Sequence, residues 1–262
     1  MPEVTGHAPG SFCWMELGTS DSGAAKKFYS SLFGWESEDT PAGPGMTYTM
    51  LRLGGKDVGA LYQLTEQYHK GVPPHWLCYV SVISADESAA KAKSLGATVT
   101  MEPFDVMDVG RMAMIQDPQG AMLALWQARS HFGAKIVGEL NTFCWNELAT
   151  TDADKAGEFY SKLFGWTIKK GDSTGPIVYH ELVNAGSEMG GMYQITPEMK
   201  GMPPNWIAYY AVADCDATAE KAKSMGAALI VPPTDIPNVG RFATIQDPQG
   251  AVFAVIKLNR AN

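Results

Sequence analysis

The sequence predicts an α+β protein of two tandem domains, each built from a pair of βαβββ units with a largely antiparallel sheet. Three observations carry this prediction. The segment Ile115–Ala121 returns letter for letter as Ile245–Ala251, so one module is written twice. Within each module, strand-like alternation is interrupted twice by a helix-like pattern. Neighbouring strands are joined by tight turns, which favours antiparallel pairing over a doubly wound parallel sheet.

The two copies keep nearly one offset along the chain. Phe12-Cys-Trp14 matches Phe143-Cys-Trp145, an offset of 143 − 12 = 131. Trp76 pairs with Trp206, an offset of 206 − 76 = 130. The second copy has therefore lost one residue, in the loop between Gln194 and Pro203. Loops absorb such changes at little cost, and a period of this size is that of a domain. We therefore expect a first domain over residues 8–128, a linker over 129–139 and a second domain over 140–258.

The first unit opens with an alternating segment that predicts a strand. A helix is expected over Gly23–Leu32, because Asp21 or Ser22 can accept hydrogen bonds from backbone amides of the first turn. It should end at Gly34, where glycine suits a left-handed terminal residue. The pair Gly54-Gly55 then indicates a hairpin. The expected strands are Phe12–Leu17, Thr47–Leu53 and Asp57–Leu64.

The second unit repeats the plan after a polar loop. Its helix is expected from Asp86 to Leu95, with Gly96 as its stop. Asp117-Pro-Gln-Gly120 joins the last two strands, and aspartate first, proline second and glycine fourth fit a type I turn. The second domain repeats both units from Leu140. The expected strands are Trp76–Val82, Ala97–Met101, Gly110–Gln116 and Ala121–Gln127.

Composition narrows the class of protein. The formal charge of 20 − 28 = −8 opposes binding to nucleic acid or to an anionic membrane, both of which need basic surface. No apolar run is long enough to span a bilayer, and the first residues lack the pattern of a signal peptide. None of the four cysteines forms a C-x-x-C pair. We expect a cytoplasmic monomer or homodimer whose partner is a small molecule.

Several motifs together resemble the vicinal oxygen chelate superfamily, the group of glyoxalases, bleomycin-resistance proteins and extradiol dioxygenases. They are Asp21 followed by Phe28-Tyr29 and Leu32-Phe-Gly-Trp35, then Gly110-Arg111, then Asp117-Pro-x-Gly120. The match covers nearly the whole chain, once per half. Within the group, the chain is most similar to tandem-domain actinobacterial proteins of the glyoxalase-like "hydroxylase" type, including a mycobacterial antigen type. The resemblance implies a curved eight-stranded sheet per domain, wrapped into a cup.

The resemblance also implies where a metal would bind, and here the sequence departs from the family. In metal-dependent members, ligands come from the first, fifth and last strands of the cup. None of the side chains at these positions can coordinate a divalent cation, and His75 corresponds to Asn205, so histidines do not rebuild a site in both halves. We therefore expect no metal and no cofactor. The positions are Trp14, Leu77 and Ala124 in the first half, and Trp145, Ile207 and Ala254 in the second.

Strand alternation suggests what lines the cup instead. If Trp14 points into it, Phe12 and Glu16 do too, because side chains alternate with a period of two. Phe143, Trp145 and Glu147 repeat the arrangement in the second half. Desolvation would raise the pKa of such a glutamate and make it a candidate general base. Alternatively, Glu16 is solvated at a strand end or paired with Arg111.

Tyrosine, glutamine and arginine side chains complete the candidate site. Tyrosine and glutamine could hydrogen-bond a polar ligand from an apolar wall, or could simply pack. Arg111 and Arg241 could bind an anionic ligand or hold two strands together by salt bridges. The candidate tyrosines and glutamines are Tyr48, Tyr62, Gln63 and Tyr79, with Tyr179, Tyr193, Gln194 and Tyr209 in the second half.

Three functions remain open at this point. The first is a metal-independent protein of the bleomycin-resistance kind that binds a small aromatic or polar organic molecule in its cups. The second is a lyase, isomerase or hydroxylase that uses Glu16 or Glu147 as base, with Arg111 or a tyrosine stabilising developing negative charge. The third, which the lost ligand positions disfavour, is a metal-dependent glyoxalase or dioxygenase.

Overall fold

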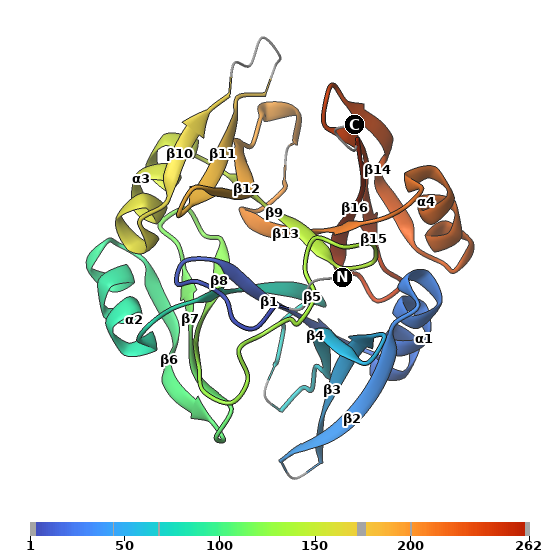
Figure 1. The fold of residues 1–262 in the computed structure, drawn as a ribbon, viewed down its shortest axis with the longest axis horizontal. Coiled ribbons are helices and arrows are strands. Elements are labelled where there is room, and N and C mark those ends of the chain that lie inside the picture. The colour runs from blue at the N-terminus through green and yellow to red at the C-terminus, as the bar shows by residue number, and fades with distance from the viewer. Residues whose placement is uncertain (1–3, 44, 68, 172–176, 200, 260–262) are drawn as a thin grey trace.

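A computed structural model describes residues 4–43, 45–67, 69–171, 177–199 and 201–259 of the chain. It confirms the predicted α+β class and its duplication: two eight-stranded sheets follow one another along the chain. Each sheet curls into a U in Figure 1, with its helices on the outer side. The two concave faces open in opposite directions, towards the bottom and the top of that view. We call them the first cup and the second cup.

The first sheet has the strand order β2-β3-β4-β1-β5-β8-β7-β6. β1 pairs in parallel with β4, and β5 in parallel with β8, because each βαβββ unit returns its last strand beside its first. The other neighbours are antiparallel, as the tight turns predict. The elements are β1 Phe12–Thr19, α1 Ser22–Phe33, β2 Glu36–Gly43, β3 Met46–Leu53, β4 Lys56–Gln63, β5 His75–Ser81, α2 Ala85–Ser94, β6 Thr98–Val106, β7 Gly110–Gln116 and β8 Met122–Ala128.

The second sheet repeats this order as β10-β11-β12-β9-β13-β16-β15-β14. A short 3-10 helix, η1 Pro197–Met199, follows β12 and has no counterpart among the described elements of the first domain. The other elements are β9 Phe143–Thr150, α3 Ala153–Phe164, β10 Thr167–Lys170, β11 Tyr179–Asn184, β12 Ser187–Gln194, β13 Asn205–Ala211, α4 Cys215–Ser224, β14 Ala228–Ile236, β15 Gly240–Gln246 and β16 Val252–Leu258. Among the described residues, none of the helices has the length and apolar character needed to cross a membrane.

Helix α1 begins and ends as its sequence predicts. The Asp21 side chain accepts a hydrogen bond from the backbone N–H of Ala24, and Gly34 takes the left-handed conformation with φ of 73°. Only glycine adopts that conformation without steric cost. The helix buries one face, which includes Phe28 and Tyr29, against its sheet and the other domain.

Two local expectations need correction. Strand β2 carries no apolar alternation and is exposed throughout, so the hydrophobic pattern does not reveal it. Phe12 does not share the face of Trp14, because the β1–β5 register shifts between these two residues and inserts Cys13 as a bulge. Phe12 instead packs on Trp166 and Trp206 of the second domain, with ring centroids 5.6 and 5.1 Å away.

The two domains are joined by a buried hydrogen-bonded chain that starts in the first domain. Trp76 on β5 donates its Nε1–H to the hydroxyl of Tyr29 (3.0 Å), and Tyr29 donates to Oδ2 of Asp247 (2.8 Å). Asp247 is the aspartate of the second Asp-Pro-Gln-Gly turn, and its Oδ1 accepts three backbone N–H groups of that turn. One carboxylate therefore shapes a turn and fastens it to the other domain.

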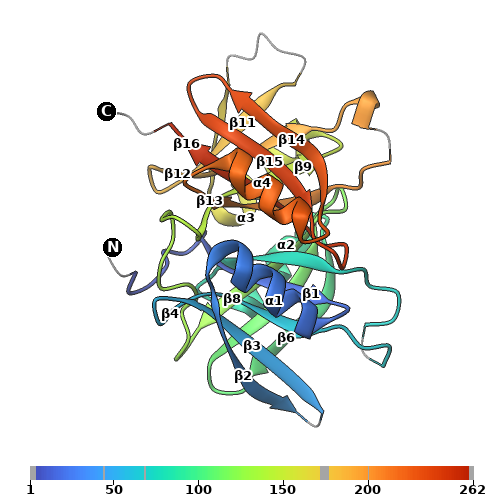
Figure 2. The same cartoon turned by 90° about the vertical axis from the view of Figure 1, so that its right-hand side faces the viewer.

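The reciprocal chain runs from the second domain to the first. Trp206 donates to the hydroxyl of Tyr160 (3.0 Å), and Tyr160 donates to Oδ2 of Asp117 (2.9 Å). Helix α1 lies beside α4, and α2 beside α3, at the two sides of the junction, as Figure 2 shows for the first pair. The repeated turn motif is thus an interdomain fastening as well as a turn.

Candidate ligand-binding site

A carboxylate held by two tyrosines lies on the concave face of the first sheet. Tyr48 on β3 donates to Oε2 of Glu16 (2.6 Å), and Tyr79 on β5 donates to Oε1 (2.7 Å). Trp14 donates its Nε1–H to the hydroxyl of Tyr48 (3.1 Å). Strand alternation predicts Trp14, Glu16 and Tyr79 on this face, and Tyr48 is a candidate through its equivalence with Tyr179. The structure brings all four into one hydrogen-bonded group, which we call the first carboxylate cluster.

Strand pairing explains how these residues meet. Tyr79 lies opposite Trp14, two pairs along from Glu16 and so on the same face, in the antiparallel β1–β5 register. Tyr48 reaches Glu16 across the intervening strand β4, where the residue beside Glu16 is the small Ala60. Two strand spacings amount to about 10 Å, a span that a tyrosine and a glutamate together can bridge only over a small residue.

The second domain repeats the cluster around Glu147. Tyr209 donates to Oε1 of Glu147 (2.6 Å), and Trp145 donates to the hydroxyl of Tyr179 (2.8 Å). Tyr179 also hydrogen-bonds Glu147. Here the small residue beneath the tyrosine is Gly191, where an added Cβ would lie 2.0 Å from the Tyr179 hydroxyl. We call this group the second carboxylate cluster.

Burial sets the protonation of both clusters. It raises the pKa of Glu16 and of Glu147, and the tyrosine hydrogen bonds only partly offset that effect. Burial and the neighbouring carboxylate hold the pKa of Tyr48 and Tyr79 well above its usual range, so both hydroxyls stay protonated and donate. Each glutamate side chain nevertheless remains partly exposed. The result is a carboxylate of raised basicity that a molecule in the cup can reach.

Most of the other residues of the first cup are apolar, and Tyr62 adds a hydroxyl group. Tyr62 on β4 faces Tyr48 across the β3–β4 pair, and nearby Glu16 and burial both raise its pKa. Leu77 on β5 lies opposite Glu16. Met114 on β7 and Tyr79 on β5 lie on either side of Ala124 of β8 in the same cross-strand row. In the second cup, Tyr193 takes the place of Tyr62, with a pKa raised to about 12, and Thr244 takes the place of Met114.

The linker adds a residue to the first cup that sequence reasoning missed. His131 packs perpendicular to Trp14 with ring centroids 4.7 Å apart, and its carbonyl accepts the Nε1–H of Trp126 (2.9 Å). Trp14 is therefore only 4% exposed, whereas Trp145 is partly exposed. No sequence pattern signals this contact, because it depends on where the linker runs over the folded sheet.

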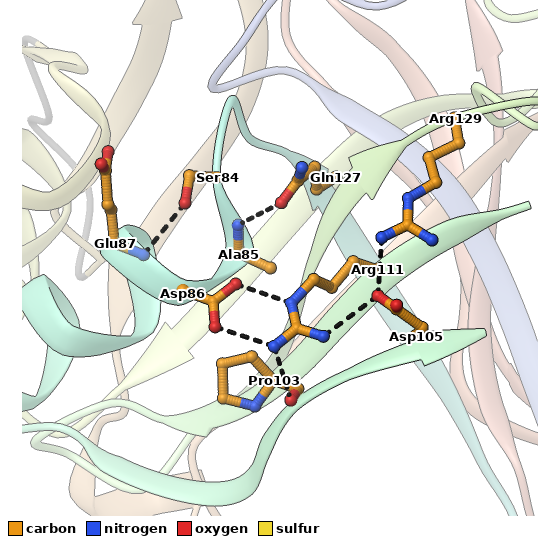
Figure 3. A network of polar contacts seen from close by, with 9 residues as sticks. All are labelled: Ser84, Ala85, Asp86, Glu87, Pro103, Asp105, Arg111, Gln127 and Arg129. Atoms are coloured by element: carbon orange, nitrogen blue, oxygen red, sulfur yellow. Dashed lines mark hydrogen bonds and ion pairs between the residues drawn. The ribbon is translucent and has the colours of Figure 1, made fainter. Parts of the chain in front are cut away.

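The two arginines expected beside the carboxylate lie elsewhere, which corrects the proposed pairing of Glu16 with Arg111. Arg111 points to the helix-covered side, where its guanidinium donates to Asp86 on α2 and to Asp105 on β6 (Figure 3). These hydrogen bonds lower the pKa of both aspartates. Arg241 repeats the arrangement with Asp216 and Asp235. The arginines hold strands and helices together, as the alternative interpretation proposes, and do not contact the clusters.

The two glutamines also lie outside the cups. Gln63 follows Tyr62 directly, so it points to the other face, where its Oε1 accepts the backbone N–H of Ser22 at the start of α1 (2.8 Å). Gln194 is exposed and lines a cavity of about 320 Å³ together with His180 and Lys170. Neither glutamine is placed to contact a ligand beside Glu16 or Glu147.

The residues at the family's metal positions do not fit a metal ion. Trp14, Leu77 and Ala124 lie on the concave face as the resemblance implies, but an indole, an isobutyl and a methyl group offer no ligand atom. Across the described residues, no group of three or more histidine, cysteine, aspartate or glutamate side chains could hold a metal. Each cluster offers a single carboxylate with tyrosines whose pKa is raised, which is a poor ligand set for a divalent cation.

Comparison with known proteins agrees with this architecture. The family model of the glyoxalase/bleomycin resistance protein/dioxygenase superfamily matches residues 11–125 and again 129–255. The chain is 43% identical over 258 residues to CFP32 of Mycobacterium tuberculosis (strain CDC 1551 / Oshkosh), covering 98% of each protein. It is 34% identical over 275 residues to the anthracycline biosynthesis protein DauV of Streptomyces sp. (strain C5), covering 98% of this chain and 97% of DauV.

Solved structures show the same fold at low identity. A Mn(II)-bound glyoxalase from Novosphingobium aromaticivorans superposes with a TM-score of 0.66 at 17% identity, covering 97% of this chain and 84% of that one. A homoprotocatechuate 2,3-dioxygenase variant from B. fuscum gives 0.67 at 13% identity, with 99% and 74% covered. Taken with the two family matches and the CFP32 likeness, these results show that the chain belongs to the glyoxalase/bleomycin resistance protein/dioxygenase superfamily.

Proposed function

We propose that the protein binds a small hydroxylated aromatic molecule in its cups without a metal ion. The observation that carries this proposal is the carboxylate cluster, which occurs in both domains as a glutamate with two tyrosines and a tryptophan. A buried polar group is costly unless it is hydrogen-bonded. A glutamate that is held by two tyrosines and still partly exposed is therefore ready to accept one more hydrogen bond from a ligand.

The surroundings favour an aromatic ligand with a hydroxyl group. Tyr62 and Met114 are partly exposed on the concave face beside the buried Trp14 and Leu77, and aromatic and methionine side chains suit flat apolar rings. A phenolic O–H would donate to Glu16 in this setting. The relative DauV is named for anthracycline biosynthesis, and anthracyclines are hydroxylated polycyclic aromatics. That likeness supports the ligand class proposed for this chain.

Binding of simple probes tests the proposal. We expect 2-naphthol and 2-hydroxyanthraquinone, neither of which chelates a metal through vicinal oxygens, to bind in equilibrium dialysis and to quench tryptophan fluorescence. Glu16→Gln with Glu147→Gln should weaken binding at least about tenfold, since hydrogen bonds to a charged group contribute about 1.5–3 kcal/mol. Arg111→Lys is the matched control and should leave binding unchanged. Absence of binding by the unmodified protein would remove the proposal.

Metal independence is tested in the same titration. Protein treated with EDTA should bind 2-naphthol as tightly as protein supplied with Mn²⁺ or Zn²⁺, because the clusters supply the polar contacts themselves. A probe affinity that appears only with added metal would show that this part of the proposal is wrong.

A second candidate function is proton transfer with Glu16 or Glu147 as the base. The raised pKa of both carboxyls favours it, because a base is most effective when its pKa approaches the working pH. The clusters would abstract a proton from a carbon beside a carbonyl group. Proton NMR in D₂O would follow loss of the α-proton signal of hydroxyacetone. Exchange that persists unchanged in the double Glu→Gln variant would exclude the carboxylates.

A further inference from the structure

We propose that His75 gives the first cup a second polar contact, which the second cup lacks. The first cup would then select planar aromatic ligands that carry two oxygen substituents about 7–8 Å apart, the spacing of diagonal neighbours on adjacent antiparallel strands. This inference rests on the proposed function, because it assumes that Glu16 receives the first ligand hydroxyl.

Gly18 is where the second contact is built. It follows Glu16 by two residues on β1 and pairs with Tyr62 on one side and with His75 on the other. A Cβ added to Gly18 would lie 3.0 Å from His75 Cε1 and 3.0 Å from Tyr62 Oη. Both side chains therefore extend over Gly18 on the concave face. Only the absence of a side chain at this position gives them room.

Hydrogen bonding fixes the state of the His75 ring. Its Nδ1 lies 2.9 Å from the carbonyl oxygen of Pro73. A carbonyl only accepts, so Nδ1 carries the proton and Nε2 of the neutral ring is an acceptor. Burial and the neighbouring His69 favour this neutral form, and Tyr62, whose pKa is raised, also lies near the ring. A ligand hydroxyl can therefore donate to Nε2 as another donates to Glu16.

The residues that lie between the two acceptors are apolar and almost fully buried. Leu77 lies opposite Glu16. It is two residues from His75 along β5 and therefore on the same face, and Ala60 lies beside Glu16 on β4. The order along the cup is thus carboxylate, hydrocarbon, imidazole. A fused aromatic ring system with an oxygen at each end matches this order, whereas a ligand with one oxygen leaves His75 unused.

The second domain supplies an internal comparison. Asn205 replaces His75 and donates its Nδ2–H to the carbonyl of Pro203 (2.8 Å). Ala149 replaces Gly18, so a methyl group fills the space that the imidazole and the tyrosine hydroxyl use in the first cup. Tyr193 is retained in place of Tyr62. The two cups share the carboxylate cluster and differ at this second contact.

The test compares 2,7-dihydroxynaphthalene with 2-naphthol, followed by NMR of the histidine Cε1–H signals. The His75 signal is identified by its loss in His75→Asn. We expect the diol to shift that signal and to bind the first cup about fivefold more tightly than 2-naphthol, the effect of one added hydrogen bond. His75→Asn should abolish the preference without weakening 2-naphthol.

A second variant keeps the imidazole of His75 but displaces it from its place beside Gly18. Gly18→Ala, which copies Ala149, should displace the ends of the His75, Tyr62 and Leu64 side chains and should also abolish the preference. Glu16→Gln should weaken both probes alike. If both probes bind with equal affinity and the His75 signal does not move, this inference is wrong while the proposed function stands. If neither probe binds, the proposed function fails and this inference with it.

Discussion

The interdomain hydrogen-bonded chain predicts a large loss of stability from the removal of one oxygen atom. Tyr29→Phe deletes a fully buried hydroxyl that donates to Asp247 and accepts from Trp76. It leaves the indole N–H and one carboxylate oxygen unsatisfied, at about 1–3 kcal/mol each. The two losses together amount to about 2–6 kcal/mol. Asp247 keeps its three backbone donors, so we expect a loss in the free energy of unfolding in the lower half of this sum, about 2–4 kcal/mol.

The chain contains a close control for this variant. Tyr210 is equally buried, packs near Trp35 and Trp76, and its hydroxyl has no hydrogen-bond partner within the described residues. Tyr210→Phe should therefore be neutral or slightly stabilising. Urea unfolding followed by tryptophan fluorescence and by circular dichroism measures both free energies of unfolding. Equal losses in Tyr29→Phe and Tyr210→Phe would refute the reasoning, because only ring packing would then matter.

Three further predictions concern the clusters and the surface. The folded protein binds the protons of Glu16 and Glu147 more tightly than the unfolded chain, since their pKa is raised; stability should therefore fall as pH rises from the usual glutamate pKa towards the raised one. Urea midpoints between acidic and neutral pH should show this slope, and the double Glu→Gln variant should lose it. Gly191→Ala should halve the number of 2-naphthol molecules bound in dialysis from two to one, because the added Cβ would lie 2.0 Å from the Tyr179 hydroxyl and disrupt the second cluster. Ala60→Gly, at the equivalent position of the first cup, is the control and should leave two molecules bound. Arg111→Lys should slightly lower the melting temperature and leave probe affinity unchanged, and a changed affinity would place the arginine in the site after all.

Much of the fold could be predicted because burial leaves a periodic trace. The strand β1 and the caps of α1 are predicted from local features of the sequence, and the structure confirms both elements. Strand β2 leaves no such trace, since an exposed edge strand has no buried face to encode. No sequence pattern indicates the bulge at Cys13, which places Phe12 on the opposite face from the one that alternation predicts.

In the candidate site too, the face of a side chain could be predicted from the sequence, but its contacts could not. Alternation correctly groups Trp14, Glu16 and Tyr79 on one face, but it cannot state that the tyrosine hydroxyl reaches the carboxylate. Adjacent residues on a strand face opposite sides, which separates Tyr62 from Gln63. The role of His131 depends on how the linker folds back over the sheet, and no short-range pattern carries that information.

The reciprocal tyrosine–aspartate pairs between the domains have a consequence for dividing the chain. Each half carries the acceptor that completes the other half, so separating the halves would leave a buried tyrosine hydroxyl and a carboxylate oxygen without a partner in each of them. The concave faces open away from this junction, so a substitution inside a cup leaves the interdomain contacts in place.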